Sequence, residues 1–118
     1  MTTDRKTIQE IQLELIERAS FNLFDGVSVR QDLEENRDLW KGAIMGRFDK
    51  SPLIPLRDIA EDYWNVDTLM IIPQPSREDE LLELAAGWSA DEVELLEGEE
   101  VAMMGGDREN KVLRVWWD

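Results

Sequence analysis

One short apolar run constrains the fold of this chain more than any other feature. Residues 66–72 (VDTLMII) are followed at once by Pro73 and Pro75. A run of this length between breakers suits a strand better than a helix, and its second half is apolar at consecutive positions, which is typical of a strand covered on both faces. The run therefore predicts a sheet at the centre of the fold.

Helical periodicity dominates the residues before this strand, because apolar side chains recur at the i, i+3, i+4, i+7 spacing that places them on one helix face. The first expected helix starts near Thr3 and buries Ile8, Ile11, Leu15 and Ala19. The second extends from Ser28, as its N-cap, to about Gly46, and buries Val29, Leu33, Trp40 and Ile44. The third follows Pro55 and buries Leu56, Ile59, Ala60, Tyr63 and Trp64.

A fourth helix and further strands are expected after the apolar run. Ser76 and the acids that follow it form an N-terminal helix pattern whose buried face is Leu81, Leu82, Ala85 and Trp88. Residues 89–98 fit a short helix or a strand, and we favour the strand. Residues 100–104 and 111–117 are expected to form a hairpin around the turn-forming residues 105–110.

Together these elements predict an α+β fold. About three N-terminal helices precede strand, helix and strands that form one small, mostly antiparallel sheet with a C-terminal hairpin. At 118 residues the chain is expected to be a single domain, residues 1–118, with a mainly helical half (1–64) and a sheet-containing acidic half (65–118).

The composition excludes several chemistries. The chain has no Cys and no His, which removes disulfides, thiolate and imidazole catalysis and the usual zinc sites. No cofactor and no metal site are expected, and an enzyme is less expected than a binding protein. Carboxylate catalysis stays possible, and the acids set among aromatic residues are Glu61, Asp62 and Asp67.

Acidic residues are concentrated in the second half of the chain. Residues 1–59 contain 11 acids and 9 bases, whereas residues 60–118 contain 16 acids and 4 bases, a net charge of −12 out of −14 for the whole chain. No base lies between the first and the last of ten acids, which are Glu78, Asp79, Glu80, Glu83, Asp91, Glu92, Glu94, Glu97, Glu99 and Glu100. Such a block creates a field of one sign.

Two interpretations of this acidic block stay open. The acids can be a solvated face that serves solubility or adaptation to high salt. Alternatively, they form the docking surface of a non-enzymatic protein-interaction module for a basic macromolecular partner, as in an inhibitor, an immunity or antitoxin-like protein, or an accessory regulator. Direct nucleic-acid binding is not expected, because the phosphate backbone would be repelled.

A function of another class would use aromatic residues. A small-molecule-binding or carboxylate-based enzymatic domain could have a pocket between the helical half and the sheet. The residues expected to line that pocket are Trp40, Tyr63, Trp64 and Trp88.

The last expected strand has apolar residues on both faces. Alternation places Val112 with Trp116 on one face, and Leu113 and Val115 with Trp117 on the other. Either helices cover both faces or a second subunit covers one. A homodimer through the C-terminal strand is therefore a second expectation.

No segment predicts a membrane or export signal. The first twenty residues carry seven charged side chains and no continuous apolar run, and no later stretch approaches the length of a spanning helix. We expect a cytoplasmic protein without membrane contact.

Overall fold

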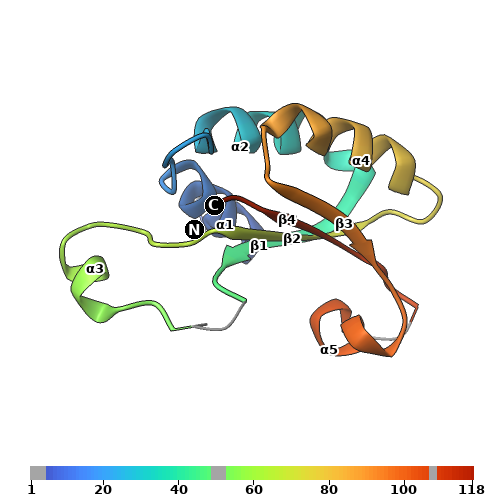
Figure 1. Ribbon diagram of the computed structural model, residues 1–118. Helices are drawn as coiled ribbons and strands as arrows, with labels where there is room; N and C mark the ends of the chain where they lie inside the picture. The colour runs from blue at the N-terminus through green and yellow to red at the C-terminus, as the bar shows by residue number, and fades with distance from the viewer. Residues whose placement is uncertain (1–4, 49–52, 107–108) are drawn as a thin grey trace.

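The fold has two layers, an antiparallel sheet and a layer of helices on one of its faces (Figure 1). The computed structural model describes residues 5–48, 53–106 and 109–118. The four strands lie in the order β1-β2-β4-β3. Their bounds are β1 Trp40–Gly46, β2 Thr68–Pro73, β3 Glu92–Leu96 and β4 Val112–Trp116. The predicted α+β class, the antiparallel sheet and a C-terminal hairpin are confirmed.

The helical layer consists of α1 (Ile8–Glu17), α2 (Gly26–Glu35) and α4 (Glu78–Ala85). Thr7 and Glu10 form a capping box at the start of α1, in which each side chain accepts a hydrogen bond from the other residue's backbone N–H. Asp25 caps α2, and hydrogen bonds from the backbone and then the side chain of Ser28 lower the pKa of its carboxyl group.

Three buried tryptophans form hydrogen bonds that join the two layers to each other and α2 to the α4 segment. The indole N–H of Trp40 in β1 donates to the Leu33 carbonyl of α2 at 2.9 Å. The Trp88 indole donates to the Asp32 carboxylate of α2 at 2.9 Å, and the Trp117 indole donates to the Trp88 carbonyl at 3.0 Å. All three belong to the same hydrophobic core, which fills the space between helices and sheet.

The predicted second helix is wrong in its second half, because residues 40–46 form strand β1. The helix ends at Asn36, whose side chain donates to the Asp32 carbonyl, and a 3-10 turn at Arg37–Leu39 leads into the strand. Trp40 and Ile44 share the helical spacing with Val29 only by coincidence. The first half of the chain therefore contributes a strand to the sheet.

Two predicted helix faces are also wrong. In α1 the buried residues are Leu13 and Ile16, while Ile8 is 80% exposed. The third helix is short, α3 (Leu56–Ala60), and exposes its apolar side: Leu56 is 81% exposed. Asp58 is the buried residue of α3, because Asn65 and Arg57 satisfy its carboxylate.

The C-terminal hairpin pairs different residues from those predicted. Residues 99–105 form a 3-10 turn (Glu99–Val101) and α5 (Ala102–Gly105), so the strand expected at 100–104 is wrong. The strand favoured within 89–98 is confirmed as β3, and it is the hairpin partner of β4. Two glycines with positive φ, Gly98 and Gly106, flank the helical insertion.

The last strand lies inside the sheet. Strand β4 pairs with β2 on one side and with β3 on the other, so its backbone edges are occupied. The strand therefore offers no backbone edge to a second copy, and the homodimer expected through it stays a prediction. The predicted division of its faces is confirmed, because Leu113, Val115 and Trp117 belong to the core beneath the helices.

The outer edge of β1 is closed by a side chain. The Gln9 amide donates to the Ala43 carbonyl at 2.8 Å and accepts from the Ala43 N–H at 2.9 Å. This pair of bonds reproduces the pattern of a neighbouring strand and protects the edge from pairing with another chain.

Within the described ranges, no helix is both long enough and apolar enough to cross a membrane.

The crossing of α1 and α2 predicts one sensitive position. A Cβ at Gly26 would lie 2.3 Å from the Ile16 carbonyl oxygen and 2.8 Å from that of Glu17. Because both are backbone atoms, we expect Gly26→Ala to lower the free energy of unfolding by about 2 kcal/mol, as overpacking of a core does. Urea denaturation measures this. Gly87→Ala is the control, since nothing lies within 4 Å of that Cβ; equal losses would contradict the explanation.

Candidate functional site

The fold divides the acidic segment into two groups. The first group lies on helix α4 and consists of Glu78, Asp79, Glu80 and Glu83. The second lies just before, on and after edge strand β3 and consists of Asp91, Glu92, Glu94, Glu97 and Glu99. The side chain of Glu100, also predicted to bind a partner, lies outside the described part. The predicted site is thus not one continuous helix face or strand.

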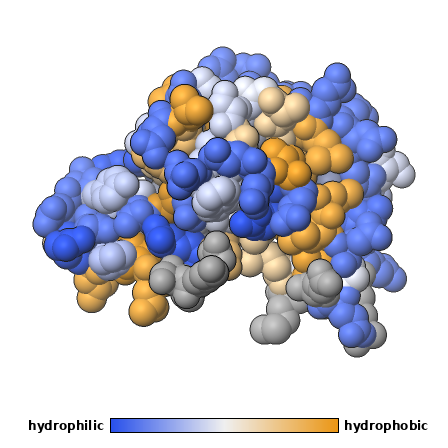
Figure 2. Space-filling model, in the orientation of Figure 1, coloured by the Kyte–Doolittle hydropathy of each residue, from blue (hydrophilic) through white to orange (hydrophobic). Residues whose placement is uncertain are grey.

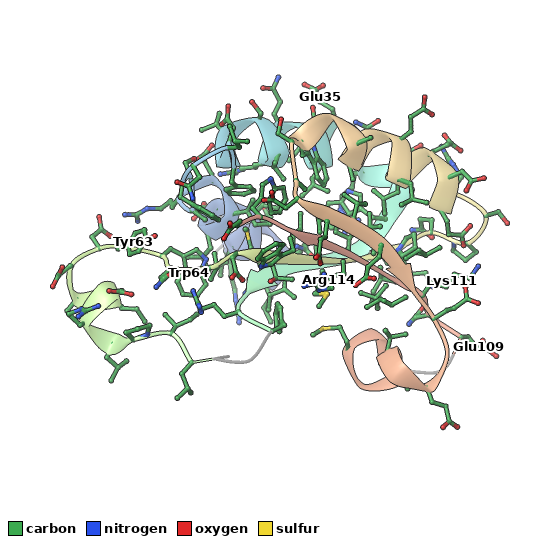
Figure 3. The ribbon with its side chains drawn as sticks, viewed as in Figure 1. Glu35, Tyr63, Trp64, Glu109, Lys111 and Arg114 are labelled. Carbon is green, nitrogen blue, oxygen red and sulfur yellow. The ribbon has the colours of Figure 1, made fainter. Side chains whose placement is uncertain are left out.

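Arg114 of β4 holds the carboxylates of β3 in place. Its guanidinium lies 2.9 Å from the Glu92 carboxylate and 3.3 Å from that of Glu94, and only 17% of the Arg114 side chain is exposed. The strand register explains this contact, because Glu94 lies directly opposite Arg114. Figure 3 shows Arg114 at the level of the strands, away from the helical layer that carries Glu35.

Two more bases from outside the acidic block reach it. The Lys111 ammonium lies 3.9 Å from both Glu78 and Glu97 and so joins the two acidic groups. Arg77 binds Glu80 at 2.6 Å, and this hydrogen bond lowers the pKa of the Glu80 carboxyl group. Arg114 and Lys111 are distant in sequence from the acids they pair with, so a count of charges along the chain does not reveal this compensation.

Other carboxylates of the block face solvent. Asp79 and Glu83 are exposed and make no ion pair within the described residues. Asp91 accepts a hydrogen bond from the backbone N–H of Asp118 at 2.7 Å. The acids therefore remain in excess over the bases that reach them.

The four residues predicted to line an aromatic pocket lie in two places in the described part of the chain. Trp40 and Trp88 are buried in the core. Tyr63 and Trp64 lie on the segment that carries α3, at the left of Figure 3. They border a separate open cavity of about 120 Å³ whose lining residues are Leu15, Arg18, Ile59, Asp62, Tyr63 and Trp64.

The acids expected for carboxylate catalysis do not form a catalytic pair. Asp62 is exposed and lies 2.6 Å from Arg18. Glu61 is exposed, and Asp67 accepts a hydrogen bond from the Thr68 hydroxyl at 2.8 Å. None of the three is a carboxyl group in an apolar cleft, the environment that a general acid requires.

A second cavity lies on the sheet face opposite α1, α2 and α4, which we call the open face. It measures about 180 Å³ and is lined by Gly42, Ala43, Ile44, Met70, Ile72, Met104 and Val112. This cavity was not predicted from the sequence, because the local pattern places Ile44 on a helix and Met104 on a strand. The apolar residues on both faces of the predicted strands were the signal that could have revealed it.

Among the described residues, no three acidic side chains gather closely enough to hold a metal ion.

No protein-family model matches this chain, and no curated protein or solved structure matches it.

The Arg114 cluster predicts a charge-dependent loss of stability. Arg114→Gln leaves Glu92 and Glu94 close together without a cation, so we expect the free energy of unfolding at low salt to fall by about 1 kcal/mol. The loss should shrink at high salt, because ions screen the repulsion. Glu94→Gln is the control, since it leaves Arg114 paired with Glu92. Similar small changes in both variants would mean that the cluster contributes nothing to stability.

Proposed function

We propose that this protein is a non-enzymatic interaction module that binds a basic protein partner through the acidic group on and around β3. Inhibitors, immunity or antitoxin-like proteins and accessory regulators act in this way. The observation that supports the proposal most is the net charge of −12 on residues 60–118, much of it on exposed side chains. Such a field attracts a basic partner over long range and raises its association rate.

Pairing with Arg114 favours binding by the β3 group. Glu92 and Glu94 are each more than half exposed, yet both are held by one nearly buried guanidinium. Because their positions are fixed before binding, a partner's lysine or arginine would meet them at a lower cost in side-chain entropy. The acids of α4 have fewer such constraints. Arg77, just before the helix, binds Glu80, and Lys111 reaches Glu78, but Asp79 and Glu83 make no ion pair within the described residues.

The surroundings of the two groups also differ. The β3 group borders the open face with its apolar cavity, and protein interfaces combine an apolar centre with a charged rim. The α4 group lies on the helical layer, whose surface in Figure 2 mixes hydrophilic atoms with scattered hydrophobic ones. We therefore assign the direct contact to the β3 group and long-range attraction to both.

Charge-matched variants test the proposal. One variant carries Glu94→Gln, Glu97→Gln and Glu99→Gln, and the other carries Asp79→Asn, Glu80→Gln and Glu83→Gln. Each loses three negative charges. A basic protein captured from the lysate of the source cells at low salt is titrated against both. We expect at least a tenfold weaker affinity, about 1.4 kcal/mol, for the first variant and a smaller loss for the second.

Two results would contradict this assignment. Equal losses in both variants would mean that the acids act only through net charge. If the native protein captures no basic protein from the lysate in a salt-sensitive way, the acids serve solvation or high-salt adaptation instead.

We also propose that the chain forms a homodimer through α1 and α3, in place of the sheet edge. Ile8, Ile11, Leu56 and Ile59 are exposed on these helices, and Leu15 and Ile59 border the same cavity. Residues 1–59 carry a net charge of only −2, so two copies repel each other least on this side.

Sedimentation equilibrium over a range of protein concentrations tests the homodimer. We expect dimers at high concentration, and we expect Leu56→Lys to abolish them because it places a charge in the apolar contact. Leu23→Lys, at another highly exposed position on the turn between α1 and α2, should leave them intact. A native protein that is monomeric at every concentration would contradict the proposal.

A further inference from the structure

The open face changes from apolar to acidic across the strands. The register aligns Ile44 of β1 with Met70 of β2, Met70 with Arg114 of β4, and Arg114 with Glu94 of β3. Since neighbouring strands lie about 4.8 Å apart, Met70 and Glu94 are separated by about 10 Å. An apolar half and an acidic half therefore lie side by side on one surface.

The apolar half is covered only at its two ends by the described residues. At one end the Phe48 ring lies over Gly46, where a Cβ would come within 2.9 Å of it. At the other end Met104 of α5 lines the cavity with Val112. Between them Ile44 is 38% exposed. Figure 1 shows α5 below the sheet, on the side away from the helical layer.

We propose that the open face binds an amphipathic basic helix of the partner, with one large apolar side chain in the cavity and a lysine or arginine on Glu94 and Glu92. This inference rests on the proposed function and specifies its binding mode. A cavity of about 180 Å³ is comparable to engineered cavities that bind benzene, so it is large enough for a leucine or phenylalanine side chain. Seven residues of a helix span about 10 Å, the distance between the two halves.

The sheet edge beside the apolar half, which is that of β1, disfavours an added strand as the occupant there. The Gln9 side chain already occupies the hydrogen-bonding groups of Ala43 on the outer edge of β1. A helix needs no such groups, because it packs its apolar side on a sheet face, as the helical layer does on the opposite face.

Charge disfavours a second copy of the chain as the occupant. Two open faces brought together would enclose the carboxylates of Glu92, Glu94 and Glu97 from both copies in one interface, with Arg114 and Lys111 already engaged and no further base supplied. A basic helix instead complements the acidic half of the surface.

Two synthetic helical peptides test the inference by fluorescence anisotropy. The first has leucine on one face and lysine on the other, and the second has glutamine in place of leucine at the same charge. At low salt we expect both to bind by charge. At high salt we expect only the leucine peptide to stay bound, because its apolar contact is not screened.

Variants locate that contact. We expect Ile44→Glu and Met104→Glu each to weaken the salt-resistant binding at least tenfold, whereas Leu23→Glu, which adds the same charge elsewhere, changes it less than about twofold. Met104 lies on α5 outside the sheet, so its variant keeps the test valid if Ile44→Glu disturbs β1. Circular dichroism confirms that each variant is folded.

The outcomes separate the inference from the proposed function. Salt-resistant binding that survives both Ile44→Glu and Met104→Glu would overturn the open-face site while leaving binding of basic partners intact. Failure of both peptides to bind at low salt would instead contradict the proposed function, and the inference with it. A native dimer that Ile44→Glu dissociates would assign the open face to a second copy and would also overturn the inference.

Discussion

Three buried indole N–H groups hold the helices together and attach them to one face of the sheet, and the rest of the structure follows from that attachment. Trp40, Trp88 and Trp117 each donate to an acceptor on α2 or at the end of the α4 segment. A buried donor left without its partner costs about 1–3 kcal/mol, so the bonds of Trp40 and Trp117 favour the face that the helices cover, and the bond of Trp88 holds α2 against the α4 segment. No helix of that layer covers the opposite face. Among the described residues, Phe48 and α5 cover parts of it.

The same sheet decides where the charges lie. Arg114 reaches Glu92 and Glu94 because β3 and β4 pair in one particular register. A shift of one residue would turn Arg114 toward the core and leave the carboxylates of β3 without their cation. Arg114 of the last strand thus holds the acids of β3 in place. Because these acids lie beside an apolar cavity, the open face is the best candidate for binding.

How much could be predicted depended on whether local pattern and tertiary contacts agreed. They agree in β2 and α4, where a proline-bounded apolar run and an acid-rich helix start give elements close to those observed. They disagree in β1, because Trp40 and Ile44 continue the helical spacing of α2 although that helix ends before Asn36. They also disagree in α3, where the buried residue is Asp58 and the apolar side chains face outward. The acidic residues were identifiable from the sequence, but their pairing was not, because it requires the β3–β4 register.

Methyl NMR with a soluble paramagnetic agent tests most directly whether the open face is the binding surface. In the free protein we expect the agent to broaden the methyl signals of Ile44 and Ile72, but not that of Ile71, which is fully buried on the other face. Adding the captured basic partner should protect Ile44 and Ile72 and leave Ile59 on α3 as broadened as before. If the partner instead protects the Ile59 methyl signal from broadening and leaves that of Ile44 broadened, the open face is not the binding surface.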